Sequence, residues 1–135
     1  MTSLADALAG EHAAIYGYGV LGAHLTGAAL NQAKQAEAAH RTRRDTLFVD
    51  LAGANQPAPA AAPAYALPFP VTDRTTAVSL ATQIEERTGA VWRTVLPDVT
   101  GEHRRLALDA LTDCALRAAR WRRTAGQVPG TVALP

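Results

Sequence analysis

The stretch NQPAPAAAPAYALPFPV, Asn55–Val71, contains five prolines, at positions 57, 59, 63, 68 and 70. Proline fixes φ and lacks a backbone N–H, so this density of prolines excludes a helix and favours extended polyproline II backbone. At ~3.1 Å per residue, the segment can span roughly 50 Å. So long a connection is unusual in a small domain, and it indicates a crossover that runs the full length of the neighbouring helices.

Two segments with helical patterning lie on each side of this crossover. They run from about Ser3 to Leu25, from about Ala28 to Leu51, from Thr72 or Asp73 to the residue before Pro97, and from Thr100 to near Gly126. Each helix is ~36 Å long at 1.5 Å per residue, and no strand alternation occurs. Short loops make each pair an antiparallel hairpin, whereas the crossover leaves the second and third helices parallel. The sequence therefore predicts a single all-α domain over residues 1–135, a four-helix bundle with one long crossover.

The composition of the chain bears on its binding partners and its cellular location. The chain is 48% hydrophobic and 19% charged, with a formal net charge of +1, which gives no general attraction to nucleic acid or membranes. The single cysteine, Cys114, excludes an intrachain disulfide. The N-terminus lacks the basic region of a signal peptide and carries Asp6 and Glu11 early, so we expect a cytoplasmic location. Ala-rich helix faces allow close helix approach, and we expect a homodimer; the sequence names no other protein partner.

Ionisable residues interrupt the apolar stripes that should face the bundle core. With residues three and four apart on one face, the predicted core positions include Glu11 in the first helix and Glu85 in the third. In the second helix Glu37, His40 and Arg44 occupy successive core positions. An unpaired buried charge costs several kcal/mol, so these groups must partner one another, a metal or water. We expect a buried polar cluster of these five residues at mid-height in the bundle.

This pattern resembles the ferritin-like superfamily, whose di-iron proteins supply Glu from one helix of each hairpin and Glu-x-x-His from the other. More closely, the chain is similar to a small actinobacterial family of ferritin-like proteins of unknown function. The similar stretches are EHAAIYGYGVLGAHL, AAHRTRRDTLFVDL and APAAAPAYALPFPVTD, with the regions around Trp92 and Trp121. The resemblance implies a ferritin-like four-helix bundle and no established activity.

The superfamily's metal motif falls on Glu11, Glu37, His40 and either Glu85 or Glu86 of this chain. The fourth helix departs from the motif, because no histidine stands three residues after its aspartates. Arg44, always protonated, can also neutralise a ligand carboxylate.

Three interpretations of this cluster follow. The first is a structural network in a non-catalytic binding or scaffold protein with a degenerate metal site and no cofactor. The second is a metal-binding protein or metal-dependent oxidoreductase that holds iron or manganese on Glu11, Glu37, His40 and Glu85. The third is a small-ligand pocket lined by the same groups.

Overall fold

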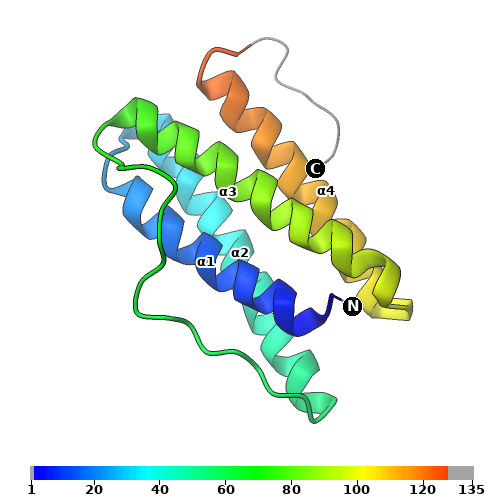
Figure 1. Ribbon diagram of the computed structural model, residues 1–135. Helices are drawn as coiled ribbons and strands as arrows, with labels where there is room; N and C mark the ends of the chain where they lie inside the picture. The colour runs from blue at the N-terminus through cyan, green and yellow to red at the C-terminus, as the bar shows by residue number, and fades with distance from the viewer. Residues whose placement is uncertain (1, 128–135) are drawn as a thin grey trace.

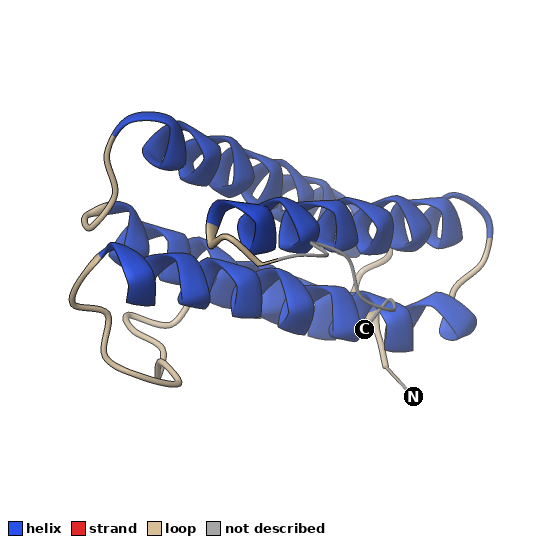
Figure 2. Cartoon of the chain, turned by 90° about the horizontal axis from the view of Figure 1, so that it is seen from above, coloured by secondary structure: helices blue, strands red, loops and turns tan. Residues whose placement is uncertain are grey.

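The computed structural model describes residues 2–127, which form four α-helices and one short 3-10 helix. These are α1 (Leu4–Gly22), α2 (Gly27–Gly53), α3 (Arg74–Val95), η1 (Leu96–Asp98) and α4 (Gly101–Thr124). No strand occurs in residues 2–127. The helices pack side by side (Figures 1 and 2), which confirms the predicted all-α four-helix bundle. None of these helices combines the length and apolar character that a membrane span requires.

The proline-rich crossover sets the topology. It leaves the end of α2 at one end of the bundle, passes along α1 and reaches the start of α3 at the opposite end (Figure 1). Consequently α2 and α3 run in the same direction, as the sequence predicted. The crossover is fixed to α1 by a contact of 2.9 Å between His12 Nε2 and the Pro59 carbonyl oxygen. Tyr65 packs against Tyr16 of α1, with ring centroids 5.6 Å apart.

The helix starts follow local sequence signals. Ser3 and Asp6 form a capping box at α1, and Asp73 and Thr76 form one at α3, so backbone N–H groups at both starts are satisfied. The prediction that the first helix runs to about Leu25 is wrong by three residues, because α1 ends at Gly22. Gly27 begins α2, with a φ of +58° that favours glycine.

The apolar core is divided into two clusters, one in each half of the bundle. The first joins the end of α1 to the starts of α2 and α3, and Leu67, Phe69 and Val71 of the crossover pack against it. The second joins the start of α1 to the ends of α2 and α3 and the start of α4. Between the two clusters lie fully buried ionisable side chains. This polar layer is the candidate functional site.

Candidate functional site

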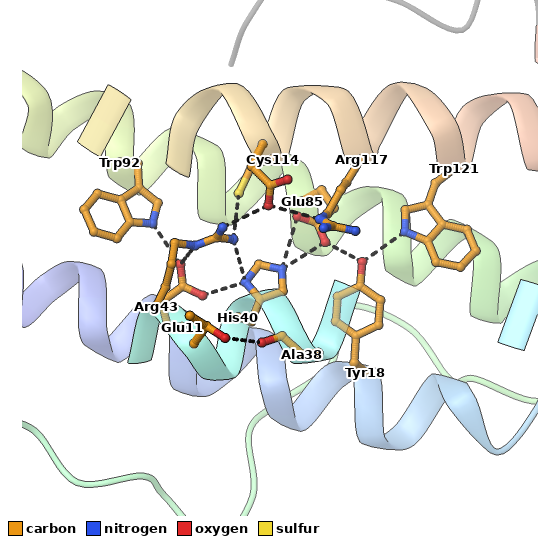
Figure 3. A network of polar contacts seen from close by, with 12 residues as sticks. Glu11, Tyr18, Ala38, His40, Arg43, Glu85, Trp92, Cys114, Arg117 and Trp121 are labelled. Carbon is orange, nitrogen blue, oxygen red and sulfur yellow. Dashed lines mark hydrogen bonds and ion pairs between the residues drawn. The ribbon is translucent and has the colours of Figure 1, made fainter. Parts of the chain in front are cut away.

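All four helices contribute to a network of polar side chains at mid-height (Figure 3). Glu11 of α1, His40 of α2 and Glu85 of α3 are each 0% exposed, so water cannot satisfy their charges. Arg43, one turn after His40, and Asp113 of α4 complete the layer. Three of the five expected members, Glu11, His40 and Glu85, therefore meet in this layer, and the other two lie elsewhere.

His40 lies between the two buried carboxylates. Its Nδ1 is 2.5 Å from Glu11 Oε2, and its Nε2 is 2.9 Å from Glu85 Oε2. Carboxylates only accept hydrogen bonds, so both ring nitrogens must donate and the ring is an imidazolium. Burial lowers the pKa of His40, but the charge of Glu85 and the hydrogen bond with Glu11 outweigh it and raise the pKa from 6.5 to about 9.

Glu11 is held by three different donors. Besides His40, Trp92 Nε1 donates to its Oε1 at 2.8 Å, and Arg43 Nε donates to the same oxygen at 3.0 Å. Burial alone would raise the pKa of Glu11, but the hydrogen bond and charge of His40 and the charge of Arg43 lower it below its usual value. Glu11 therefore stays ionised without solvent.

Arg43 extends the network to α4. Its Nη1 donates to Asp113 Oδ2 at 2.9 Å, and Arg117 Nε donates to the same oxygen at 3.0 Å. Its Nη2 also lies 3.2 Å from His40 Nδ1, where two donors meet and repel; the Glu11 carboxylate between them offsets this. The three cations His40, Arg43 and Arg117 thus balance the carboxylates of Glu11, Glu85 and Asp113, and the layer is electrically neutral.

Glu85 continues the network in the other direction. The Tyr18 hydroxyl donates to Glu85 Oε2, and Trp121 Nε1 donates to the Tyr18 oxygen at 3.0 Å. Burial and the negative charge of Glu85 raise the pKa of Tyr18 well above its usual value, so the phenol stays protonated. A continuous string of hydrogen bonds therefore crosses the bundle. In order, it joins Trp92, Glu11, His40, Glu85, Tyr18 and Trp121.

The prediction that Glu37 and Arg44 belong to the buried cluster is wrong. Glu37 pairs with Arg41 on the surface of α2 at 3.4 Å, and Arg44 pairs with its neighbour Asp45 at 3.0 Å. The side chains of Glu37 and Arg44 are 27% and 26% exposed. The physical reason is that α2 is rotated slightly about its axis relative to the predicted orientation. Its buried face therefore carries Ala36, and the neighbouring Glu37 lies outside it.

The same rotation brings Arg43 inward, and the sequence contained a signal for it. The buried positions of α2 are spaced four and three apart, as a core stripe should be. They are Ala29, Ala33, Ala36, His40, Leu47 and Leu51. Arg43 continues this spacing, with a side chain only 11% exposed. A core stripe drawn through Ala29, Ala33 and Ala36 would have found Arg43, whereas the stripe through Glu37 leads to Arg44.

Cys114 and the two tryptophans of the network limit what the site can do. Cys114, fully buried beside the network, lies 3.8 Å from Arg43 Nη2. Burial and the charge of Glu85 raise the pKa of its thiol, so it is a neutral side chain and not a nucleophile. Trp92 and Trp121 are 0% exposed, and each closes one end of the hydrogen-bonded string.

The donor set does not fit the di-metal centre of the resemblance. Of the four expected ligands, the structure brings Glu11, His40 and Glu85 together and leaves Glu37 on the surface. Both nitrogens of His40 are already engaged by carboxylates, and neither has a lone pair free. Within residues 2–127, no three His, Cys, Asp or Glu side chains are arranged to ligate one ion.

Comparison with known proteins places the chain in a family. It belongs to the family described as a domain of unknown function (DUF4439), whose pattern matches residues 3–135. Its fold is similar to the crystal structure of a conserved hypothetical protein, rv2844, from Mycobacterium tuberculosis, with a TM-score of 0.87. The two sequences are 39% identical over 90% of this chain and 92% of that chain. No curated protein matches the chain. These matches assign a family and a fold, and they carry no activity.

Proposed function

We propose that this chain is a non-catalytic binding protein of ferritin-like architecture, in which a closed ion-pair network occupies the height of a degenerate metal site. The observation that carries the proposal is the geometry of His40. Its two ring nitrogens lie 2.5 Å from Glu11 and 2.9 Å from Glu85. These are direct hydrogen bonds, which leave no room for a metal ion between the histidine and either carboxylate. The layer needs no cation from solution to balance its charges.

Proton competition supports the proposal. A histidine ligates a metal only through a neutral nitrogen, so the metal must displace a proton. With the pKa of His40 raised to about 9, that displacement costs about 3 kcal/mol at pH 7. Removing this proton would also leave the carboxylates of Glu11 and Glu85 to share a single ring N–H.

The arginines add a second obstacle to metal binding. Arg43 donates to Glu11 and to Asp113, the two acids nearest to it, and Arg117 donates to Asp113 as well. A divalent cation would have to replace guanidinium bonds that are already charge-assisted. The position three residues after Asp113 is Leu116, an apolar side chain on the exposed face of α4 that offers no ligand.

Elemental analysis of protein purified without chelators tests the proposal. We expect far less than one iron, manganese or zinc per chain, and no rise in melting temperature when Fe²⁺, Mn²⁺ or Zn²⁺ is added. The informative variant is His40→Gln, and the matched control is His103→Gln, because His103 lies near the surface with a side chain 41% exposed.

Near-stoichiometric metal, with a thermal shift that His40→Gln abolishes and His103→Gln retains, would overturn the proposal. That outcome would favour the alternative function, a metal-dependent oxidoreductase that holds iron or manganese on Glu11, His40 and Glu85. The homodimer and the cytoplasmic location stay predictions from the sequence.

A further inference from the structure

A hollow lies between α1 and α3 beneath the crossover, lined by residues of all three. Its volume is about 130 Å³, and Tyr65 and Leu67 of the crossover form part of its wall. The wall contributed by α1 consists only of small residues: Gly10, Ala13, Ala14 and Gly17. Figure 1 shows the crossover passing along α1 on its way to the start of α3. This cavity is separate from the polar layer, since none of the six residues of the hydrogen-bonded string lines it.

The antiparallel packing of the two helices explains why the hollow persists. At one end, a Cβ added to Gly10 would lie 3.8 Å from Val91. At the other end, a Cβ added to Gly17 would lie 2.5 Å from Ile84, so the isoleucine fills the space that glycine leaves. The two glycines are two helical turns apart, about 10 Å, and so are the two apolar residues opposite. Between them α1 presents only alanine, too short to fill the gap.

Three polar side chains of α3, Gln83, Arg87 and Thr88, border this apolar space. Arg87 of α3 lines the cavity with an exposed side chain, and it has no ion-pair partner within residues 2–127, whereas its neighbour Glu86 pairs with Arg122. Gln83, one turn earlier on α3, also lines the cavity, and its buried Oε1 has no hydrogen-bond partner in the same part of the chain. A buried amide without a partner is uncommon. Rotation of the amide exchanges its oxygen with an N–H donor.

We propose that this cavity binds a small monocarboxylate with an apolar body the size of a benzene ring. The inference rests on the proposed function of a binding protein and names its ligand class. An apolar cavity of about 150 Å³ accommodates benzene, so the space found here matches one ring. The body of the ligand lies between α1 and α3 against Ala13, and its carboxylate pairs with Arg87 at the rim. Charge complementarity selects an anion, because the rim offers an unpaired guanidinium and no carboxylate.

Calorimetric titration of the protein with benzoate tests the inference, with benzyl alcohol and benzylamine as neutral and cationic probes of similar size. We expect benzoate to bind one per chain and more tightly than benzyl alcohol, and benzylamine to give no binding. Arg87→Gln should weaken benzoate binding about tenfold or more, because one charge-assisted hydrogen bond is lost. Arg93→Gln is the matched control on the same helix, since Arg93 is also exposed but does not line the cavity.

A second pair of variants tests the location. Ala13→Leu places a larger side chain in the hollow and should reduce benzoate affinity about tenfold or more while the protein keeps its melting temperature. Ala9→Leu makes the same change at an exposed position of α1 and should leave binding intact. If Ala13→Leu does not fold, the exposed Arg87→Gln still decides the question.

Three results would overturn the inference: no benzoate binding at millimolar concentration, equal binding of benzylamine, or unchanged affinity in Arg87→Gln. Elemental analysis keeps the two proposals apart. Protein that is free of metal and does not bind benzoate loses only this inference. Protein with stoichiometric metal loses the proposed function, whatever benzoate does.

Discussion

Adjacent arginines on α2 offer a sharp test of the polar layer. Arg43→Met removes a guanidinium with an 11% exposed side chain that bonds Glu11 and Asp113. Arg44→Met removes one with a 26% exposed side chain that bonds only its neighbour Asp45. The two substitutions have identical chemistry and lie on the same helix. We expect Arg43→Met to destabilise the protein strongly and Arg44→Met to change the free energy of unfolding by no more than ~0.5 kcal/mol.

The magnitude for Arg43 follows from what its loss leaves behind. Glu11 is 0% exposed and keeps His40 and Trp92 as donors, so it loses one charge-assisted hydrogen bond worth about 2 kcal/mol. Asp113 is partly exposed and keeps Arg117, so its loss is below about 1 kcal/mol. The layer also acquires a net negative charge, which the buried protein interior screens poorly, and this adds to the cost. The expected total is about 3 kcal/mol, at the lower end of what breaking a buried ion pair costs.

Urea denaturation followed by far-UV circular dichroism measures both variants. The slope of unfolding free energy against urea should stay constant, so that the midpoint shift reports stability alone. Adding Glu11→Gln to Arg43→Met restores neutrality, and we expect the double variant to be about 1 to 3 kcal/mol more stable than the sum of the two single effects. Equal destabilisation by Arg43→Met and Arg44→Met would refute the reasoning, because it would mean that the buried partners of Arg43 contribute nothing.

Three further predictions concern protonation and hydrogen bonding in the polar layer. Because the folded pKa of His40 is raised from 6.5 to about 9, its contribution of about 3 kcal/mol is complete below pH 6.5 and lost as the pH rises through 9; chemical denaturation across this range should show the fall, and His40→Gln should flatten it. Glu11 and Asp113 have lowered pKa values, so their contribution holds above about pH 4.5 and is lost on further acidification. Tyr18→Phe leaves the buried Trp121 N–H without its acceptor and should cost about 1 to 3 kcal/mol by the same denaturation assay. Tyr16→Phe, at a half-buried position of the same helix, is its control, and an equal cost there would contradict the prediction.

The topology could be predicted from the sequence because one physical constraint dominates it. Prolines between Asn55 and Val71 exclude a helix from this segment. The segment can span roughly 50 Å, more than the ~36 Å of a bundle helix, so it can run the full length of one. These properties are local and do not depend on which side chains meet across the core. Ser3 and Asp73 likewise cap α1 and α3 through residues three positions away. Each of these features can be predicted from residues that are close together in the sequence.

The membership of the polar layer could be predicted only in part, because periodicity leaves the rotation of α2 open. Ala33, His40 and Leu47 fit a stripe that contains Arg43 as well as one that contains Arg44. Both stripes alternate steps of three and four residues, so propensity cannot choose between them. The choice depends on partners from other helices, Glu11 on α1 and Asp113 on α4, which are 32 and 70 residues from Arg43 in sequence.

The position of the network between two apolar clusters suggests what it contributes to the fold. Apolar side chains tolerate sliding of one helix past another, since any apolar neighbour is acceptable. A buried imidazolium between Glu11 and Glu85 does not, because a shift of α2 by one turn would move His40 about 5 Å and leave both carboxylates unpaired. The energetic gain of such a network over an apolar layer is small or negative, whereas the cost of any other register is several kcal/mol. The layer therefore fixes how α1, α2 and α3 align, and with them the two helices that enclose the cavity beneath the crossover.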